Sequence, residues 1–290
     1  MRTEKEMLDI ILGTARDDER IHAVYMNGSR TNPHAPKDRF QDYDIVYVVD
    51  ETESFIRDRD WIRRFGEISF MQYPDESPDY PSDRAGSYAW LMMFSDGNRL
   101  DLTVMTVARA RKNVLEDSLC VVLLDKDGSL PPVPESSDRS YRVKAPSPEQ
   151  FGSCCNEFYW CLNNVAKGLW RGEVPYAQDM LNFVVRKQLE RLLSWKVGVL
   201  TGYSVSVGKS AKYMYRWLSA EEWRAYLDTY CGADIPAMWK SVETMCGLFL
   251  GTARWLSDKC GFVFNETEAK AGLLYLNSVR AMPGQKPVQK

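Results

Sequence analysis

Three aspartates in the first half of the chain have the residue type and spacing of a metal-binding site. Asp42 and Asp44 stand at the start of an apolar run, Ile45–Val49, and Asp101 lies between two leucines. Successive side chains of a strand point to opposite faces, so Asp42 and Asp44 project to the same side. If the strand that carries Asp101 pairs beside them, a third carboxylate joins this set of hard oxygen ligands, which suits Mg²⁺ and substrate phosphates. The pattern predicts the chemistry of metal-dependent nucleotidyl transfer.

A glycine-serine turn followed by an arginine precedes these aspartates. Gly28 and Ser29 follow a short apolar segment, so backbone N–H groups and a hydroxyl can approach a phosphate, with Arg30 as a cationic clamp. The alternatives are a plain turn at Gly28 and, for Asp101, a salt bridge to Arg99 or another arginine. Binding of a triphosphate bridged by Mg²⁺ explains both the Gly-Ser turn and the carboxylates. The alternative of a plain turn explains only the Gly-Ser pair.

The surrounding sequence predicts the elements that position these residues. Thr3–Glu6 has the pattern of a capping box, which predicts a helix ending near Arg16. The Asp96-Gly97 pair between two apolar runs predicts a hairpin that brings Asp101 into a sheet. We expect strands at 22–27, 45–49, 67–72, 88–94, 100–105 and 119–124, and a helix at 56–65.

The pattern changes in the second half of the chain. Leu130–Ser147 is rich in proline, serine and charge, which predicts a domain linker. From Pro148 to about Cys260, apolar residues recur at helical spacing, which predicts a helical bundle, and the tail from Ala281 is expected to be frayed. We therefore predict an α+β protein with a catalytic domain of mixed sheet and flanking helices at residues 1–135 and an all-helical substrate-binding domain at 136–290.

Charged residues of the helical half are further candidates for binding. Asp179 and Glu190 are eleven residues apart, which in an α-helix places them on one face as an acidic wall for a cationic substrate. The alternative is an ion pair between Glu190 and Arg186 at i,i+4 spacing. Lys209 and Lys212 lie where a helix start would let them reach phosphates, and an ordinary solvated surface is the alternative for them.

Composition narrows the class of protein. The chain has 290 residues, of which 44% are hydrophobic and 27% charged, and a formal net charge of −3, so it is globular and lacks the basic balance of a nucleic-acid-binding protein. The absence of an apolar run of membrane-spanning length and of an N-terminal signal core predicts a cytoplasmic protein without a membrane partner. Seven cysteines without Cys-x-x-Cys spacing and only two histidines predict reduced thiols and no structural zinc.

Four segments together resemble the bacterial aminoglycoside 6-adenylyltransferases, the streptomycin-modifying enzymes. The segments are Met26-Asn27-Gly28-Ser29-Arg30, Phe40-Gln41-Asp42-Tyr43-Asp44-Ile45, the run from Phe94 to Thr103, and the run from Val207 to Lys212. The resemblance covers most of the chain. It implies a nucleotidyltransferase-fold N-terminal domain, a helical C-terminal domain, and Mg²⁺-dependent transfer of AMP from ATP to a hydroxyl of streptomycin, acting as a monomer or weak homodimer.

The resemblance also implies roles for individual residues. Asp42 and Asp44 would bind the metal and Asp101 would complete the site, with Asp101 or a free carboxylate such as Glu157 as the general base. Residues expected to hold the triphosphate are Gly28, Ser29, Arg30, Lys209 and Lys212. Three carboxylates are expected to bind the cationic aminoglycoside: Asp179, Glu190 and Glu157. Streptomycin, for example, carries guanidinium groups.

Two alternatives remain at this stage. A related nucleotidyltransferase acting on another small hydroxylated acceptor, such as a lincosamide or a different aminoglycoside, would carry the same carboxylates. A non-catalytic nucleotide-binding or toxin–antitoxin interaction module on the same fold should tolerate their loss, whereas this chain retains all three.

Overall fold

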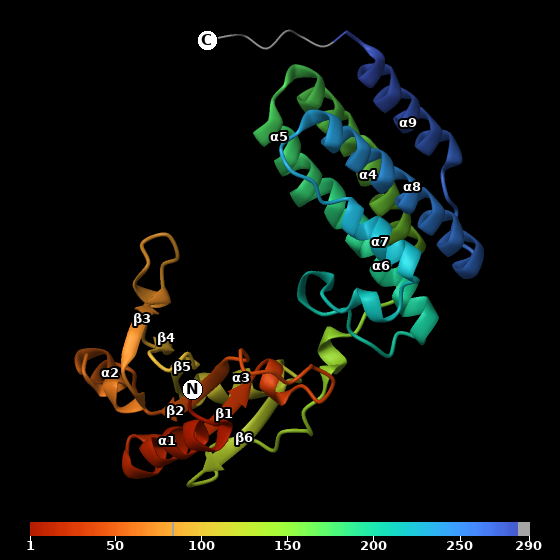
Figure 1. The fold of residues 1–290 in the computed structure, drawn as a ribbon. Coiled ribbons are helices and arrows are strands. Elements are labelled where there is room, and N and C mark those ends of the chain that lie inside the picture. The colour runs from red at the N-terminus through yellow and green to blue at the C-terminus, as the bar shows by residue number, and fades with distance from the viewer. Residues whose placement is uncertain (83, 284–290) are drawn as a thin grey trace, which may run out of the picture. The chain divides into compact units, whose positions relative to one another are not determined.

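The computed structural model describes residues 1–82 and 84–283, and the chain divides into two compact units, Met1–Ser140 and Tyr141–Lys290. The first unit combines a sheet with helices, and the second is built of helices (Figure 1). The architecture is therefore α+β, as the sequence predicted.

In the described part of the chain, the strands of the first unit form one six-stranded sheet in the order β3-β4-β5-β2-β1-β6. Neighbouring strands are antiparallel except β2 and β5, which are parallel. The strands are β1 (Ile21–Asn27), β2 (Tyr43–Val49), β3 (Ile68–Gln72), β4 (Ser87–Phe94), β5 (Arg99–Thr106) and β6 (Cys120–Asp125). Each predicted strand is confirmed, and so is the β4–β5 hairpin.

Helices cover both faces of this sheet. One face packs against α1 (Glu4–Asp17), α2 (Glu53–Arg57) and a 3₁₀ turn at Trp61–Phe65, and the other packs against α3 (Val107–Glu116). Strand β2 is therefore buried on both sides, which explains its almost unbroken apolar sequence. The predicted capping box is present at Thr3, whose side chain accepts from the backbone N–H of Glu6.

An aromatic cluster anchors the helical layer to β2. Tyr47 lies against Trp61 and Phe65 with ring centroids 6.1 and 6.2 Å apart, and its hydroxyl donates to the carbonyl of Ile11 in α1. Each of these fully buried side chains contributes on the order of 2 kcal/mol of transfer free energy. This packing holds β2, which carries Asp44, rigidly in the middle of the sheet.

Two predictions about helices in this unit need correction. The expected helix at 56–65 is two short pieces, because the charged stretch between Arg57 and Trp61 leaves helical geometry at Asp58. Helix α3 was not predicted. Its arginine- and alanine-rich sequence has good intrinsic helix propensity, but its apolar stripe is narrow, since Ala110 and Val114 are buried and Val107 packs beside them.

The second unit is a set of packed helices. They are α4 (Pro148–Arg171), α5 (Val174–Asp179), a π-helical segment (Met180–Val185), α6 (Arg186–Thr201), α7 (Ala220–Asp228), α8 (Ile235–Cys260) and α9 (Glu266–Ala281), with 3₁₀ turns at Lys209–Ala211 and Met214–Arg216. Helix α4 packs against α8 through stacked Phe158 and Phe249 rings, and against α9 at Gly272. Figure 1 shows these helices running together in the second unit. The predicted bundle is confirmed, and it extends through α9, beyond the predicted limit near Cys260.

The π-helical segment between α5 and α6 changes the helix phase. Each residue of a π-turn advances by a smaller angle than a residue of an α-helix, so residues on either side of Met180–Val185 lose the α-helical register. The prediction that Asp179 and Glu190 share a face assumed an uninterrupted α-helix, and that argument fails here.

The described residues include no helix that is both long and apolar enough to cross a membrane. All seven cysteines are free thiols. Most of the tail that was predicted to be frayed, residues 284–290, lies outside the described residues.

Candidate active site

The register of the central strands places polar side chains side by side. In the parallel pair of β2 and β5, Asp44 is opposite Asp101, and in the antiparallel pair of β1 and β2, Asn27 is opposite Asp44. Side chains at paired positions point to the same face of a sheet. Asn27, Asp44 and Asp101 therefore form a row across three neighbouring strands, and the predicted convergence of Asp44 and Asp101 is confirmed.

The row lies on the face of the sheet that α3 covers further along the strands. Tyr25, Val46 and Val48 share that face and pack against α3. At the row itself the side chains are partly solvent-accessible: Asp101 is 18% exposed, and Asp42, which immediately precedes β2, is 36% exposed. The carboxylates thus lie where a solute can reach them.

Arg99 is the cation of this carboxylate group. Its Nε and Nη2 atoms each donate to one oxygen of Asp101 at 2.7 Å, and its Nη1 lies 3.5 Å from Oδ2 of Asp42. The salt bridge considered as the alternative role for Asp101 is therefore present. It does not exclude chemistry at Asp101, because both residues are at the accessible end of the strand.

Burial and mutual repulsion perturb the carboxylates. The pKa of Asp44 is raised to about 6, chiefly by burial and then by the charges of Asp101 and Asp42. Burial also raises the pKa of Asp42, against the opposing effect of Arg99. Closely spaced acids that resist ionisation are typical of functional sites, because a bound cation can offset the charge that the fold leaves poorly compensated.

Gly28 forms a cradle for Asp44. Its φ angle is +80°, a conformation that L-residues rarely adopt, and a β-carbon built at this position would overlap the Oδ2 atom of the Asp44 carboxylate. Ser29 follows in a 3₁₀ turn, Ser29–Thr31, to which Gln41 donates through its side-chain amide at the Ser29 carbonyl, 3.1 Å away. The turn and the carboxylate are therefore in direct contact.

Arg30 makes different contacts from those expected. Its Nη2 donates to the carbonyl of Gln41 at 2.8 Å, its Nε donates to the carbonyl of Asp42 at 3.1 Å, and the guanidinium lies over the Tyr43 ring. The side chain is only 9% exposed. The guanidinium is committed to the backbone that leads into β2, so Arg30 positions Asp42 and Asp44, and its contact with a triphosphate stays a prediction.

Asn27 is a site residue that the sequence interpretation missed. Its Oδ1 atom is buried and, among the described residues, has no hydrogen-bond partner. Buried polar atoms are nearly always paired, so this atom at the edge of the carboxylate row calls for a ligand or water as partner. The signal available in the sequence was its position at the end of a strand, directly before Gly28.

The donor chemistry at the row fits a divalent cation, but the side chains are not arranged as a preformed metal site. Within residues 1–82 and 84–283, no three His, Cys, Asp or Glu side chains are arranged to hold a metal ion. The cause at this position is Arg99, which takes both oxygens of Asp101. The three carboxylates nevertheless provide hard oxygen ligands of the kind that Mg²⁺ requires.

The candidate lysines of the second unit lie in an irregular loop. Lys209 and Lys212 are exposed, and the 3₁₀ turn Lys209–Ala211 is a single turn, so they do not begin a long helix as expected. Ser210 and Ala211 have positive φ angles of 54° and 61°. Strained backbone of this kind is concentrated at binding sites, which keeps the loop a candidate for phosphate contact.

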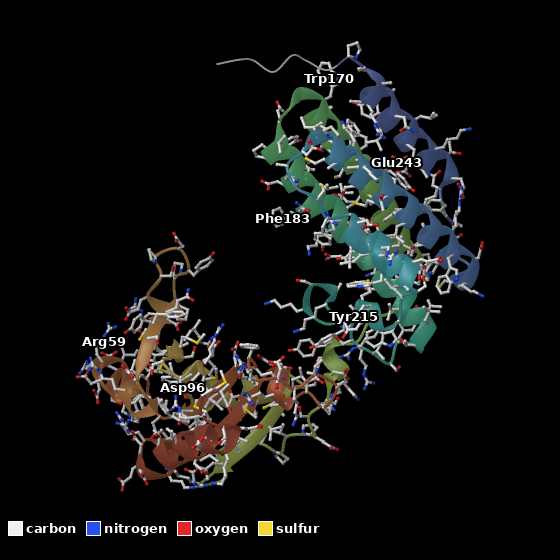
Figure 2. All side chains as sticks on the ribbon, viewed as in Figure 1. Arg59, Asp96, Trp170, Phe183, Tyr215 and Glu243 are labelled. Carbon is white, nitrogen blue, oxygen red and sulfur yellow. The ribbon has the colours of Figure 1, made fainter. Side chains whose placement is uncertain are left out.

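The candidate acidic residues of the second unit differ in their surroundings. Glu157 and Asp179 are exposed, whereas Glu190 accepts from Lys187 at 2.8 Å and from the Tyr226 hydroxyl at 3.0 Å. Phe183, on the π-helical segment, projects outward from the helices (Figure 2). An exposed aromatic ring on the segment that follows Asp179 suits a ligand with apolar and cationic parts.

The alternative ion pair between Arg186 and Glu190 is not what the structure contains. Arg186 is 2% exposed, and its guanidinium donates to Asn182 and Thr229 while lying 3.8 Å from the centroid of the Tyr230 ring. Arg186 therefore joins the π-helical segment to the end of α7.

These features define a nucleotidyltransferase: a mixed sheet, carboxylates on adjacent central strands beside a glycine-serine turn, and a helical unit that follows in the chain. The chain matches the streptomycin adenylyltransferase family over residues 1–279 and belongs to this family. It is therefore an enzyme of the adenylyltransferase class.

Two sequence relatives agree with this family assignment. The chain is 40% identical over 265 residues to an aminoglycoside 6-adenylyltransferase of Bacillus subtilis (strain 168), covering 91% of this chain and 93% of the relative. It is 39% identical over 251 residues to one of Campylobacter jejuni, covering 86% of each. Among solved structures, an aminoglycoside 6-adenyltransferase from Bacillus subtilis aligns over 97% of this chain and 100% of its own at 34% identity, with a TM-score of 0.48.

Proposed function

We propose that this protein transfers AMP from ATP to a hydroxyl group of streptomycin in a Mg²⁺-dependent reaction and so confers resistance to the drug. The observation that carries the proposal is the register pair of Asp44 and Asp101, which places two carboxylates side by side next to Asp42 and the Gly28 cradle. Family membership and the names of the relatives support an aminoglycoside as acceptor.

The proposed reaction is an in-line displacement at the α-phosphate. The acceptor hydroxyl oxygen forms a bond to the α-phosphorus, the bond from that phosphorus to the bridging oxygen breaks, and pyrophosphate leaves with the electron pair. Asp42, Asp44 and Asp101 would hold Mg²⁺, which when bound offsets negative charge on the phosphates. The backbone N–H groups of the turn at Gly28 and Ser29 would hold phosphate oxygens, since successive N–H groups in a turn form an anion-binding concavity.

The proton of the acceptor hydroxyl must go to a base. Asp101 and Glu157 are the two candidates. A carboxylate that binds a metal ion loses basicity, which favours a carboxylate outside the proposed metal set, such as Glu157, exposed on α4. Replacement by glutamine separates them: Glu157→Gln lowers kcat and flattens the acidic limb of the pH–rate profile if Glu157 is the base.

The acceptor-binding surface is proposed to include Asp179, Glu157 and Glu190 of the helical unit. Carboxylates attract the guanidinium groups of streptomycin. Lys209 and Lys212 are proposed to contact the phosphates from their exposed loop. Asp179→Asn is expected to raise KM for streptomycin about tenfold, equivalent to the loss of one charge-assisted hydrogen bond, with KM for ATP unchanged.

The test is pyrophosphate release by the purified protein with ATP and streptomycin, with and without Mg²⁺, followed by mass spectrometry of the drug. The proposal requires an AMP-sized mass gain that depends on Mg²⁺ and disappears in Asp42→Asn. Asp50→Asn is the matched control, because Asp50 follows the other end of β2 and is 77% exposed. Release with another aminoglycoside but not with streptomycin would refute the substrate while keeping the chemistry.

A further inference from the structure

The Arg99 guanidinium lies between the carboxylates of Asp101 and Asp42. Both of its contacts with Asp101 are short and directed, forming a two-pronged pair, and a third nitrogen approaches Asp42. Arg99 and Asp101 are two residues apart on β5, so their side chains lie on the same face of the sheet. The guanidinium is therefore in direct competition with any cation that would use the oxygens of Asp101.

Among the described residues, Arg99 is the one cation that pairs with these carboxylates, and its single charge does not balance theirs. Asp42, Asp44 and Asp101 carry three potential negative charges, and the other nearby arginine, Arg30, is tied to backbone carbonyls. A divalent cation would satisfy the carboxylates better than one guanidinium can, because it brings twice the charge to a smaller volume.

Arg99 is free to move in a way that Arg30 is not. Its side chain is 39% exposed, compared with 9% for Arg30, and its backbone is held by pairing with Met93 of β4. The side chain can turn outward without disturbing the core. Arg30, by contrast, would leave the part-buried carbonyls of Gln41 and Asp42 without their donor if it moved.

We propose that Arg99 is an exchangeable counter-ion that a divalent cation displaces from Asp101 and Asp42, and that the released guanidinium then binds phosphate oxygens of ATP. This inference rests on the proposed function and deepens it. The planar fork that now fits the two oxygens of Asp101 fits two phosphate oxygens equally well. Arg99 is then a catalytic residue that touches substrate after the metal has taken its place on the carboxylates.

The first measurement is the affinity of the protein for Mn²⁺ in the absence of nucleotide. Isothermal titration calorimetry and electron paramagnetic resonance detect the binding. Arg99→Gln removes the competing charge, so we expect it to bind Mn²⁺ about tenfold more tightly than the wild type, a typical size for a coupling between two ligands of one site. Arg57→Gln is the control, because Arg57 pairs with Glu53 on the exposed surface of α2. Its Mn²⁺ affinity should equal that of the wild type.

The second measurement is the kinetics of AMP transfer. Arg99→Gln should raise KM for ATP and lower kcat about 10²-fold, because a donor to the reacting phosphates is lost. Arg99→Lys keeps the charge but loses the fork, so its Mn²⁺ affinity should match the wild type while kcat stays low. This second variant keeps the test valid if Arg99→Gln is poorly folded.

The outcomes separate this inference from the proposed function. Equal or weaker Mn²⁺ binding by Arg99→Gln, in a wild type that binds Mn²⁺ and transfers AMP, would overturn the counter-ion role alone. Unchanged ATP kinetics in Arg99→Gln would overturn its phosphate contact. Failure of both proteins to bind Mn²⁺ would overturn this inference together with the metal dependence of the proposed reaction.

Discussion

The Asp44 carboxylate lies against the α-carbon of Gly28, so closely that residue 28 has no room for a side chain. Gly28 comes from the end of β1 and Asp44 from the start of β2, which pair in antiparallel register. The glycine of the turn and the aspartate of the strand are thus one structural unit. Its conformation determines where the buried carboxylate points.

Gly28→Ala should displace the Asp44 carboxylate and reduce AMP transfer by about 10²-fold, since a shift of about 1 Å in a catalytic group has an effect of that order. Gly128→Ala is a matched control, because Gly128 also has a positive φ, 69°, yet a β-carbon there meets nothing within 4 Å. The control should lose about 1 kcal/mol of stability from backbone strain with activity retained. Equal activity in the two variants, measured as kcat/KM, would contradict the cradle.

Asp44→Asn should separate activity from stability. Burial and the charges of Asp101 and Asp42 raise the pKa of Asp44 to about 6, so its ionised form destabilises the fold at pH 7.5 by about 2–3 kcal/mol relative to an uncharged group. The variant should therefore melt at a higher temperature while kcat falls by about 10²–10³-fold. Calorimetric melting without metal checks the first effect, and a lower Tm would refute it.

Arg30→Met separates a positioning role of Arg30 from the predicted triphosphate contact. Loss of the guanidinium leaves the carbonyls of Gln41 and Asp42 without their donors, which should cost about 1–3 kcal/mol and lower kcat with little change in KM for ATP. Arg39→Met, in the same loop but exposed, serves as control. A large rise in KM for ATP in Arg30→Met would support the triphosphate contact.

His22 should make stability depend on pH. Hydrogen bonding to Asp127, with a further contribution from Asp50, raises the pKa of His22. A raised pKa means that the stabilisation is fully present below the unfolded value of about 6.5 and is lost as pH rises through the folded value. The wild type should exceed His22→Gln in stability by about 1 kcal/mol at pH 5.5 and by much less at pH 8.5. Urea titrations of the wild type, His22→Gln and Asp127→Asn check this. Asp127→Asn should lose the same pH-dependent part of the stability as His22→Gln.

Arg186→Met should destabilise the helical unit. The buried guanidinium donates to the side-chain oxygen of Asn182 and to the carbonyl of Thr229. Its removal leaves the Asn182 oxygen without this donor and the Thr229 carbonyl with Ser241 as donor, at a cost of about 2–4 kcal/mol. Arg191→Met, on the exposed side of the same helix, should stay within about 0.5 kcal/mol of the wild type. Similar denaturation midpoints for the two variants would show that Arg186 is not a structural link.

Much of the fold could be predicted because its signals are local. The apolar runs of β1 and β2, the alternation in β5, the Asp-Gly hairpin and the capping box at Thr3 depend on residues close together in the chain. Helix α3 was not predicted because it buries only a narrow stripe of residues. The π-helical segment was not predicted because nothing in its composition distinguishes it from an α-helix.

Residue types along the chain were enough to identify Asp42, Asp44, Asp101 and the Gly-Ser turn as candidates, because alternation and turn chemistry are properties of short segments. Contacts between distant segments settled the rest: the register that aligns Asp44 with Asp101, the commitment of Arg30 to the backbone before β2, and the unpaired oxygen of Asn27. A guanidinium can pair with any carboxylate or carbonyl within reach, and which one is in reach depends on how strands far apart in sequence are aligned. For that reason the sequence could name the charged groups but could not assign their partners.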